Sequence, residues 1–208
     1  MTKHRKREEW IEEILEAAAD ELVSVGYSRL TMEAIAARTD LSKGGVYRFF
    51  SNKREIALAL FTRHYRELLD FEPDEVIVWN LPITETLYRL LFEMWEEGRL
   101  RRDQKVWVQL ISETLRDEEF TAERERLLGQ LREKFGELVK RLFDHYGIET
   151  GEELDQKLDT ALRLGIALLE GLVIQGTTGT SIEEQAALVR RFIEVMLMNV
   201  LGEINVDA

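Results

Sequence analysis

The sequence contains no cysteine, two prolines and three histidines among its 208 residues. The absence of cysteine excludes disulfides, thiolate metal sites and a cysteine nucleophile. The scarcity of proline favours long, uninterrupted helices. His4, His64 and His145 are scattered, and none has a second histidine or a cysteine three or four residues away. We therefore expect neither a bound metal nor a cofactor.

Long apolar runs and enzyme motifs are also missing. No stretch reaches the roughly 18 apolar residues of a membrane span, and Leu164–Ile174, which comes closest, contains Glu170. The basic start is followed by Glu8 and Glu9, where a signal peptide needs an apolar run, so we expect a cytoplasmic protein. The sequence has no glycine-rich loop after a strand and no serine in a nucleophile elbow. An enzyme is therefore not expected.

The net charge of −12 is unevenly distributed along the chain. Residues 1–55 hold ten Lys/Arg and ten Asp/Glu, so the rest of the chain carries the whole excess. Within this neutral part, basic residues gather in the arm Lys3–Arg7 and around residues 43–54. Binding to a polyanion depends on such local patches and not on the total charge. The arm is either a solvated tail or a contact to phosphates or the minor groove.

Apolar residues recur at helical spacing throughout, and no strand alternation persists. The pattern predicts an all-α chain of about nine helices. We expect an N-terminal three-helix domain at residues 1–52 and a larger helical domain at 53–208. The first helix ends at Gly26, and a helix that Asn52 opens runs to Asp70. A connecting loop follows at 71–81, and the later helices are expected near 83–99, 103–116, 119–146, 152–176 and 182–201.

Two short helices joined by a tight turn are predicted between positions 31 and 49. Thr31 and Ser42 are each placed to cap one of them, Met32–Arg38 and the segment from Ser42 to Phe49. The break Thr39–Leu41 usually needs a residue that tolerates positive φ, and Asp40 is a permitted occupant. Two successive glycines at 44 and 45 cost roughly 1 kcal/mol each in a helix. Close approach of the backbone to DNA is a reason for that cost.

Five short segments lie between positions 14 and 53: Ile14-Leu15-x-Ala17-Ala18, Gly26-Tyr27, Leu30-Thr31-Met32-x-x-Ile35-Ala36, Leu41-Ser42-Lys43-Gly44-x-Val46-Tyr47-x-Phe49-Phe50 and Asn52-Lys53. With these segments the region resembles the N-terminal domain of the TetR family of regulators. The resemblance implies a helix-turn-helix DNA-binding domain at residues 1–52 and a ligand-binding and dimerisation domain at 53–208. It also implies that Thr31, Ser42, Tyr47, Phe50 and Lys53 lie at or beside phosphates of a pseudo-palindromic operator in double-stranded DNA. It places Lys43 and Gly44 at base edges, and Arg48 at a variable position. Asp40 departs from the family, which usually has glycine there.

The last two predicted helices carry apolar stripes with alternating spacings of four and three. Both helices are apolar beyond one face, which indicates burial on more than one side. Paired between two subunits they would form the four-helix homodimer interface that is usual in the family; alternatively, they fill the core of one chain. The residues assigned to the interface are Leu162, Gly165, Leu169, Leu172, Val189, Ile193, Met196 and Val200.

The middle helices are rich in aromatic residues, and the family encloses a ligand pocket in this region. The pocket residues expected on that basis are Leu91, Trp95, Trp107, Leu110, Ile111, Thr114 and Phe135. An aromatic stripe at helical spacing is more often part of a core than of a pocket. Glu170 belongs either to a pocket or, more simply, to a polar stripe. Together the features predict a homodimeric repressor that a small hydrophobic ligand releases from its operator. The alternatives are an architectural or protein-partnered DNA binder, and a helical module that does not bind DNA.

Overall fold

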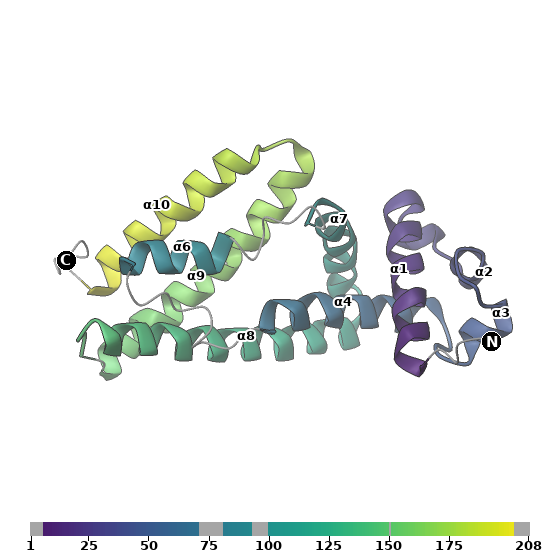
Figure 1. Ribbon diagram of the computed structural model, residues 1–208, viewed down its shortest axis with the longest axis horizontal. Coiled ribbons are helices and arrows are strands. Elements are labelled where there is room, and N and C mark those ends of the chain that lie inside the picture. Colours follow the sequence, from purple (N-terminus) through teal and green to yellow (C-terminus); the bar gives the residue numbers. More distant parts are fainter. Residues whose placement is uncertain (1–5, 71–80, 93–99, 150, 202–208) are drawn as a thin grey trace. The chain divides into compact units, whose positions relative to one another are not determined.

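The computed structural model describes residues 6–70, 81–92, 100–149 and 151–201. These residues form nine α-helices and two short 3₁₀ turns, with no strand among them (Figure 1). The predicted all-α fold is confirmed. The helices are α1 (Arg7–Val25), α2 (Met32–Ala36), α3 (Lys43–Tyr47), α4 (Lys53–Leu69), α6 (Ile83–Phe92), α7 (Leu100–Ile111), α8 (Glu118–His145), α9 (Glu152–Thr178) and α10 (Ile182–Leu201); the 3₁₀ turns are Tyr27–Arg29 and Ser112–Leu115.

Several helix boundaries differ from the expected ones. The helix expected to reach Arg38 ends at Ala36, because Ala37 to Ser42 form the turn. The helix expected at 103–116 is α-helical only to Ile111 and then tightens into the 3₁₀ turn. Within the expected helix 83–99, residues 93–99 lie outside the described residues, as do residues 71–80 of the expected loop. None of the described helices is long and apolar enough to cross a bilayer.

The chain packs into two compact units. The head unit comprises Met1–Arg66 and Arg102–Glu125, and the body unit comprises Glu67–Arg101 and Arg126–Ala208. The head unit therefore contains α1, α2 and α3, most of α4 and α7, and the first residues of α8. The functional division expected after residue 52 remains a prediction, since packing alone does not assign function.

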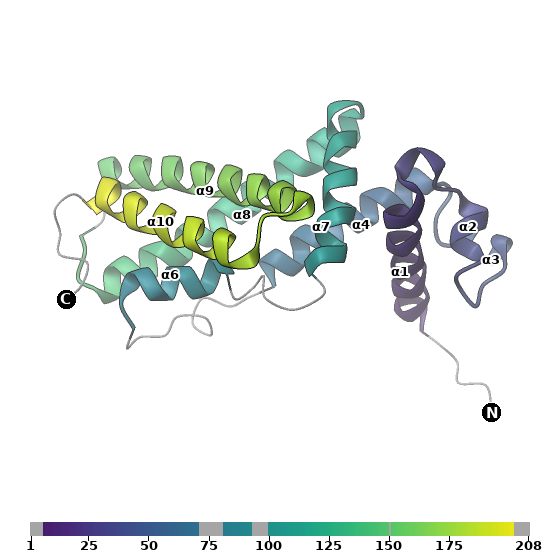
Figure 2. The same ribbon diagram turned by 90° about the horizontal axis from the view of Figure 1, so that it is seen from above.

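The head unit has a small core of its own. Ile14 and Leu22 of α1 are fully buried, as are Ile35 of α2 and Val46 of α3. In this unit α2 packs against both α1 and α3 (Figure 2). Gly26, with φ of 80°, caps α1 by donating its N–H to the carbonyl of Leu22. Glycine is favoured there because other residues rarely adopt positive φ.

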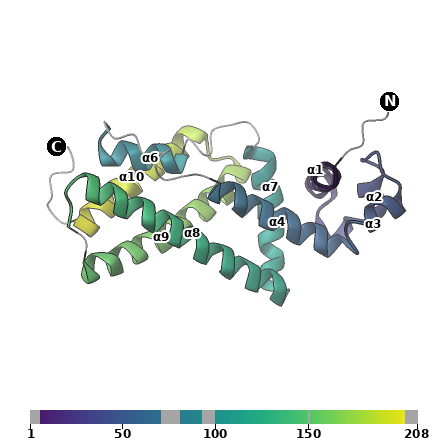
Figure 3. The same cartoon turned by 60° about the horizontal axis from the view of Figure 1, so that its bottom comes forward.

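The body unit is a layered bundle of α6, α8, α9 and α10. Helix α10 packs against both α6 and α9 (Figure 3). Its core joins Leu142 of α8, Leu172 of α9 and Ile193 of α10, all at most 1% exposed. Arg190 of α10 ties α6 in place, since it pairs with Glu85 at 2.8 Å and its guanidinium carbon lies 3.4 Å from the centre of the Tyr88 ring.

Candidate nucleic-acid interface and apolar cavity

Side-chain caps hold the two short helices of the helix-turn-helix. The Thr31 hydroxyl accepts a hydrogen bond of 3.1 Å from the backbone N–H of Ala34, and the Ser42 hydroxyl accepts one of 3.1 Å from Gly45. Both residues therefore act as the sequence predicted for helix stability. Their exposure leaves both hydroxyls at the surface.

The turn between α2 and α3 does not use positive φ. No described residue other than glycine has positive φ, so the expectation for Asp40 is wrong. Instead, polar side chains satisfy the turn: Thr39 donates to the carbonyl of Ala36 and accepts from the N–H of Leu41. The N–H of Asp40 donates to the Glu13 carboxylate of α1 at 2.6 Å. These hydrogen bonds hold the turn without a residue of positive φ.

The outward side of α3 carries a cation and an aromatic ring. Lys43 is exposed and pairs with Glu33 of α2, and its ammonium lies 5.8 Å from the centre of the Tyr47 ring. Tyr47 is 43% exposed although its neighbour Val46 is fully buried. Arg48 is also exposed. The outward side of α3 thus presents cationic and hydroxyl donors of the kind that contact phosphates or base edges.

The two glycines of α3 have different surroundings. A Cβ at Gly45 would lie 3.2 Å from two atoms of Leu41, so glycine is needed there for packing inside the protein. A Cβ at Gly44 would meet nothing closer than the Ser42 hydroxyl at 3.9 Å. The fold therefore explains Gly45, whereas Gly44 is exposed and its glycine has no packing reason in the protein itself.

Lys53, at the start of α4, is held by the turn that follows α1. Its ammonium donates to the carbonyls of Tyr27 and Ser28 at 2.9 and 3.2 Å and lies 4.8 Å from the Tyr27 ring centre. The expected cap of α4 is present, since the Asn52 side chain accepts from the N–H of Glu55 at 3.0 Å. Phe50 is half-buried.

Two polar contacts that the sequence did not predict bind later helices to the N-terminal ones. Arg54 donates to both carboxylate oxygens of Asp117 at 2.5 and 2.6 Å, and to Glu119 of α8 at 2.5 Å. The guanidinium of Arg54 lowers the pKa of Asp117 to about 2. The Gln109 amide of α7 donates to the carbonyl of Leu22 and accepts from the N–H of Tyr27. Sequence separations of 63 residues and more leave no periodic signal for such pairs.

An aromatic cluster occupies the other side of α4. The His64 ring lies 5.8 Å from that of Tyr65 and 6.3 Å from that of Trp107, centre to centre. Burial of the imidazole, together with the charge of Arg63, lowers the pKa of His64 to about 4. The imidazole is therefore neutral near pH 7.

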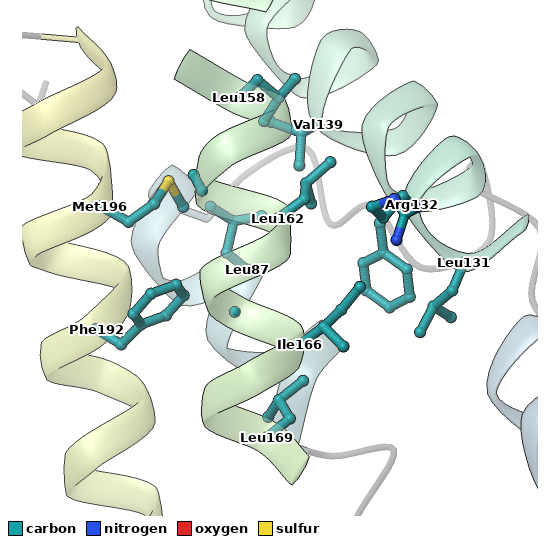
Figure 4. Close-up of a pocket in the computed structure, with 13 residues that line it drawn as sticks. Leu87, Leu131, Arg132, Val139, Leu158, Leu162, Ile166, Leu169, Phe192 and Met196 are labelled. Carbon is teal, nitrogen blue, oxygen red and sulfur yellow. The ribbon is translucent and has the colours of Figure 1, made fainter. Parts of the chain in front are cut away.

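A cavity of about 70 Å³ lies within the body unit, between α6, α8, α9 and α10 (Figure 4). Its lining is apolar except for Arg132 of α8, which the close-up shows on the opposite side from Phe192 and Met196 of α10. Arg132 precedes Phe135 and Val139 at helical spacing, a pattern that could have identified it in the sequence. The lining residues are Leu87, Leu131, Arg132, Phe135, Val139, Leu158, Ala161, Leu162, Gly165, Ile166, Leu169, Phe192 and Met196.

Among the residues expected in the ligand pocket, Phe135 is the described one that lines this cavity. Trp107 and Leu110 are buried in the head unit and Ile111 is half-buried there, and their assignment to a ligand pocket stays a prediction. Trp95 lies outside the described residues, and the side chains of Leu91 and Thr114 do too. Glu170 is not among the cavity-lining residues.

The residues assigned to a dimer interface lie inside the single chain. Leu172, Val189, Ile193 and Val200 are at most 5% exposed. Leu162, Gly165, Leu169 and Met196 line the cavity. These positions therefore pack within one chain, and their assignment to a homodimer interface stays a prediction. A second set of apolar residues on the same helices is exposed: Leu164, Ile174, Ile182, Leu188, Val195 and Met198.

Two family models match most of the chain. Residues 14–60 match the model of bacterial regulatory proteins of the tetR family. Residues 84–198 match the model of the C-terminal part of BetI-type transcriptional repressors. The chain is also 36% identical over 83 residues to YhgD of Bacillus subtilis (strain 168), an HTH-type transcriptional regulator, and this match spans 40% of the chain and 43% of that relative.

Solved structures share the fold across nearly the whole chain. A transcriptional regulator from Rhodococcus sp. Rha1 has a TM-score of 0.73 at 18% identity, covering 90% of this chain and 96% of its own. A regulator from Saccharomonospora viridis in complex with choline has a TM-score of 0.71 at 23% identity, with coverages of 90% and 97%. The fatty acid degradation regulator FadR of Bacillus halodurans has a TM-score of 0.68 at 18% identity, with coverages of 94% and 97%.

Proposed function

Because the chain belongs to the TetR family of bacterial transcriptional regulators, we propose that it is a cytoplasmic repressor released from its operator by a small apolar ligand. The observation that carries the proposal is that one chain combines the exposed cation and ring of α3 with an apolar cavity in the body unit. A regulator with a filled body unit would have favoured the alternative, a DNA binder without an inducer.

DNA contact is proposed for the side of α3 that carries Lys43 and Tyr47. A second helix of a helix-turn-helix reads the major groove with its N-terminal residues. Lys43 and Gly44 are the first two residues of α3, so these two are assigned to base edges. Thr31, Ser42, Tyr47, Arg48, Phe50 and Lys53 are assigned to the phosphate backbone or its immediate surroundings.

A homodimer is proposed to bring two copies of α3 to a pseudo-palindromic site, one helical turn of DNA apart. Support comes from the exposed apolar residues of α9 and α10, which face solvent in a single chain. Leu188, Val195 and Met198 follow one another on α10 at spacings of seven and three and are 46%, 49% and 60% exposed. Contiguous exposed apolar side chains of this kind mark interaction surfaces.

Ligand binding is proposed to act by widening the cavity. A volume of about 70 Å³ is about half of the ~150 Å³ apolar cavity that is known to hold benzene. A ligand larger than benzene therefore requires α8, α9 or α10 to shift. It then binds the widened conformation more tightly than the closed one, and this difference in affinity is what a ligand needs to change the equilibrium.

Helix α8 extends from the head unit, which contains the helix-turn-helix, into the lining of the cavity. Its residues up to Glu125 belong to the head unit, and Leu131 to Val139 of the same helix line the cavity. At its start, Asp117 and Glu119 bind Arg54, which directly follows Lys53 on α4. A displacement of α8 by a ligand would therefore pull on the start of α4, which leads from the helix-turn-helix.

The choline complex of the Saccharomonospora viridis regulator suggests a quaternary ammonium as a second ligand candidate. Phe135 and Phe192 line the cavity and offer faces for cation–π contact. The cavity lining, however, contains Arg132 and no carboxylate, so a cation would meet a like charge. An apolar ligand is the better fit.

The test is a titration of labelled DNA from upstream of the protein's own gene, with candidate ligands chosen by thermal shift. Ligands that bind the native state raise its apparent stability. Those ligands should also lower the affinity of the protein for the operator. Saturating operator should in turn lower the affinity for the ligand by the same factor. If every stabilising ligand leaves operator affinity unchanged, the proposed release is wrong.

A further inference from the structure

Arg132 lies where two cavities of the body unit meet. It lines the apolar cavity and also a polar groove that runs along α8 and α9. Leu158 and Leu162 line both as well. The guanidinium is therefore at the boundary between an apolar interior and a solvated groove, where an amphipathic molecule would place its polar end.

The other basic residues of the groove are already paired. Lys140 pairs with Asp155 at 2.8 Å, Arg141 with Glu137 at 2.7 Å and Arg163 with Asp159 at 2.7 Å. Arg132 has no ion pair or hydrogen bond within the part of the chain that the structure describes. It is half-buried, so its charge is less solvated than those of its paired, exposed neighbours.

We infer that the ligand of this cavity is an amphipathic monocarboxylate, a medium-chain fatty acid, with its tail in the apolar cavity and its carboxylate on Arg132. The inference rests on the proposed function and names the chemical class of its ligand. A guanidinium binds a carboxylate through two parallel hydrogen bonds, and such charge-assisted bonds are stronger than neutral ones. The remaining lining offers the tail aliphatic side chains, two phenyl rings and the thioether of Met196.

Gly165 fixes the width of the cavity from the α9 side. A Cβ there would lie 3.3 and 3.4 Å from two ring carbons of Phe192, and both residues line the cavity. An alanine would push the ring toward the cavity. Gly129 of α8 has nothing within 4 Å of a built Cβ, so the same substitution there adds a methyl group without this effect.

Three probes with one tail and different heads test the class of ligand: octanoate, 1-octanol and octyltrimethylammonium. Calorimetry on the full chain should give octanoate the highest affinity, roughly 10- to 100-fold above octanol, since a hydrogen bond to a charged group contributes that much. The ammonium should bind most weakly of the three. Equal affinities for octanoate and octanol, or preference for the ammonium, would overturn the inference.

Variants at Arg132 test the residue itself. Arg132→Met should weaken the binding of octanoate roughly 10- to 100-fold and leave that of octanol unchanged. Arg132→Lys keeps the charge but loses the two parallel hydrogen bonds, so it should weaken octanoate binding less than Arg132→Met does. Arg126→Met removes the same charge from an exposed position of the same helix and should change neither. A loss of octanoate and octanol together would indicate damage to the fold, which a circular dichroism melt of each variant would reveal.

The cavity itself is tested by Gly165→Ala, which should weaken octanoate and octanol to the same extent, with Gly129→Ala as the matched control. Should octanol or the ammonium bind best and release the operator, the proposed function stands and the carboxylate inference is wrong. Should octanoate bind through Arg132 without affecting the operator, the site stands and the proposed release is wrong. Octanoate binding that survives both Arg132→Met and Gly165→Ala would place the ligand elsewhere.

Discussion

Asp117 accepts two hydrogen bonds from Arg54, at 2.5 and 2.6 Å, while its own Oδ1 also accepts from the backbone N–H of Glu119 at 3.0 Å. One carboxylate thus caps α8 and holds α4. Asp117 therefore joins the start of α4 to the start of α8. In the proposed mechanism, this contact passes a displacement of α8 to α4.

Removing the charge of Asp117 should alter the acid dependence of stability. Arg54 lowers the pKa of Asp117 from 3.8 in the unfolded chain to about 2, so its contribution is present above pH 4 and is lost as pH falls toward 2. Asp117→Asn should lower the melting temperature at pH 6 and bring the two proteins closer together at pH 2.5. Asp159→Asn, in an exposed pair with Arg163, is the control and should change the pH 6 melting temperature by less.

His64 predicts a second pH effect, at milder acidity. Its pKa is lowered from 6.5 to about 4, so the unfolded chain takes up the proton first and stability falls as pH drops from 6.5 toward 4. The loss by pH 5 should be about 2 kcal/mol. Urea unfolding of His64→Phe at pH 7 and pH 5 should lack this loss. A variant with the same pH dependence as the wild type would show that His64 is not its source.

The two glycines of α3 should respond in opposite ways to alanine. Gly44→Ala meets open space and should stabilise the free protein by up to about 1 kcal/mol, yet weaken operator binding if the backbone approaches DNA there. Gly45→Ala crowds Leu41 and should destabilise the free protein. Thermal melts and operator titrations of both variants separate the two effects. If Gly44→Ala binds the operator with full affinity, the backbone at Gly44 does not closely approach DNA.

The exposed face of α10 should control the oligomeric state. Val195→Glu and Met198→Glu each place a charge among exposed apolar side chains, and each should shift a dimer toward monomer in analytical ultracentrifugation. Gln156→Glu adds the same charge at an exposed position of α9 and serves as the control. Val189→Ala, within the chain's own core, should lower stability and leave the dimer constant of the folded protein nearly unchanged. A dimer that survives both glutamate variants would place the interface elsewhere.

Local signals predicted the fold well, because caps such as Ser42 and Asn52 and the glycine at 26 act within a few residues. The seam of α9 and α10 was recognised as apolar, but its assignment to a partner was not possible from spacing. Val189 and Ile193 have the same period whether they face a helix of their own chain or of another. Trp107 shows the same ambiguity between core and pocket. Arg54 and Asp117 lie 63 residues apart, and only the folded chain brings them together.

The most direct test of the proposed DNA-binding surface is to measure binding to DNA from upstream of the protein's own gene at increasing salt concentration. Lys53→Ala should weaken binding evenly across sequences and lower the slope of log K against log salt by about 1, whereas Lys43→Ala should weaken binding and relax sequence preference. Lys157→Ala, in an exposed pair on α9, should leave slope and affinity unchanged. Because Lys53 also binds Tyr27 and Ser28, its variant must first be shown to fold. Unchanged operator affinity and salt slope in Lys43→Ala and Lys53→Ala would contradict DNA binding through α3 and the start of α4.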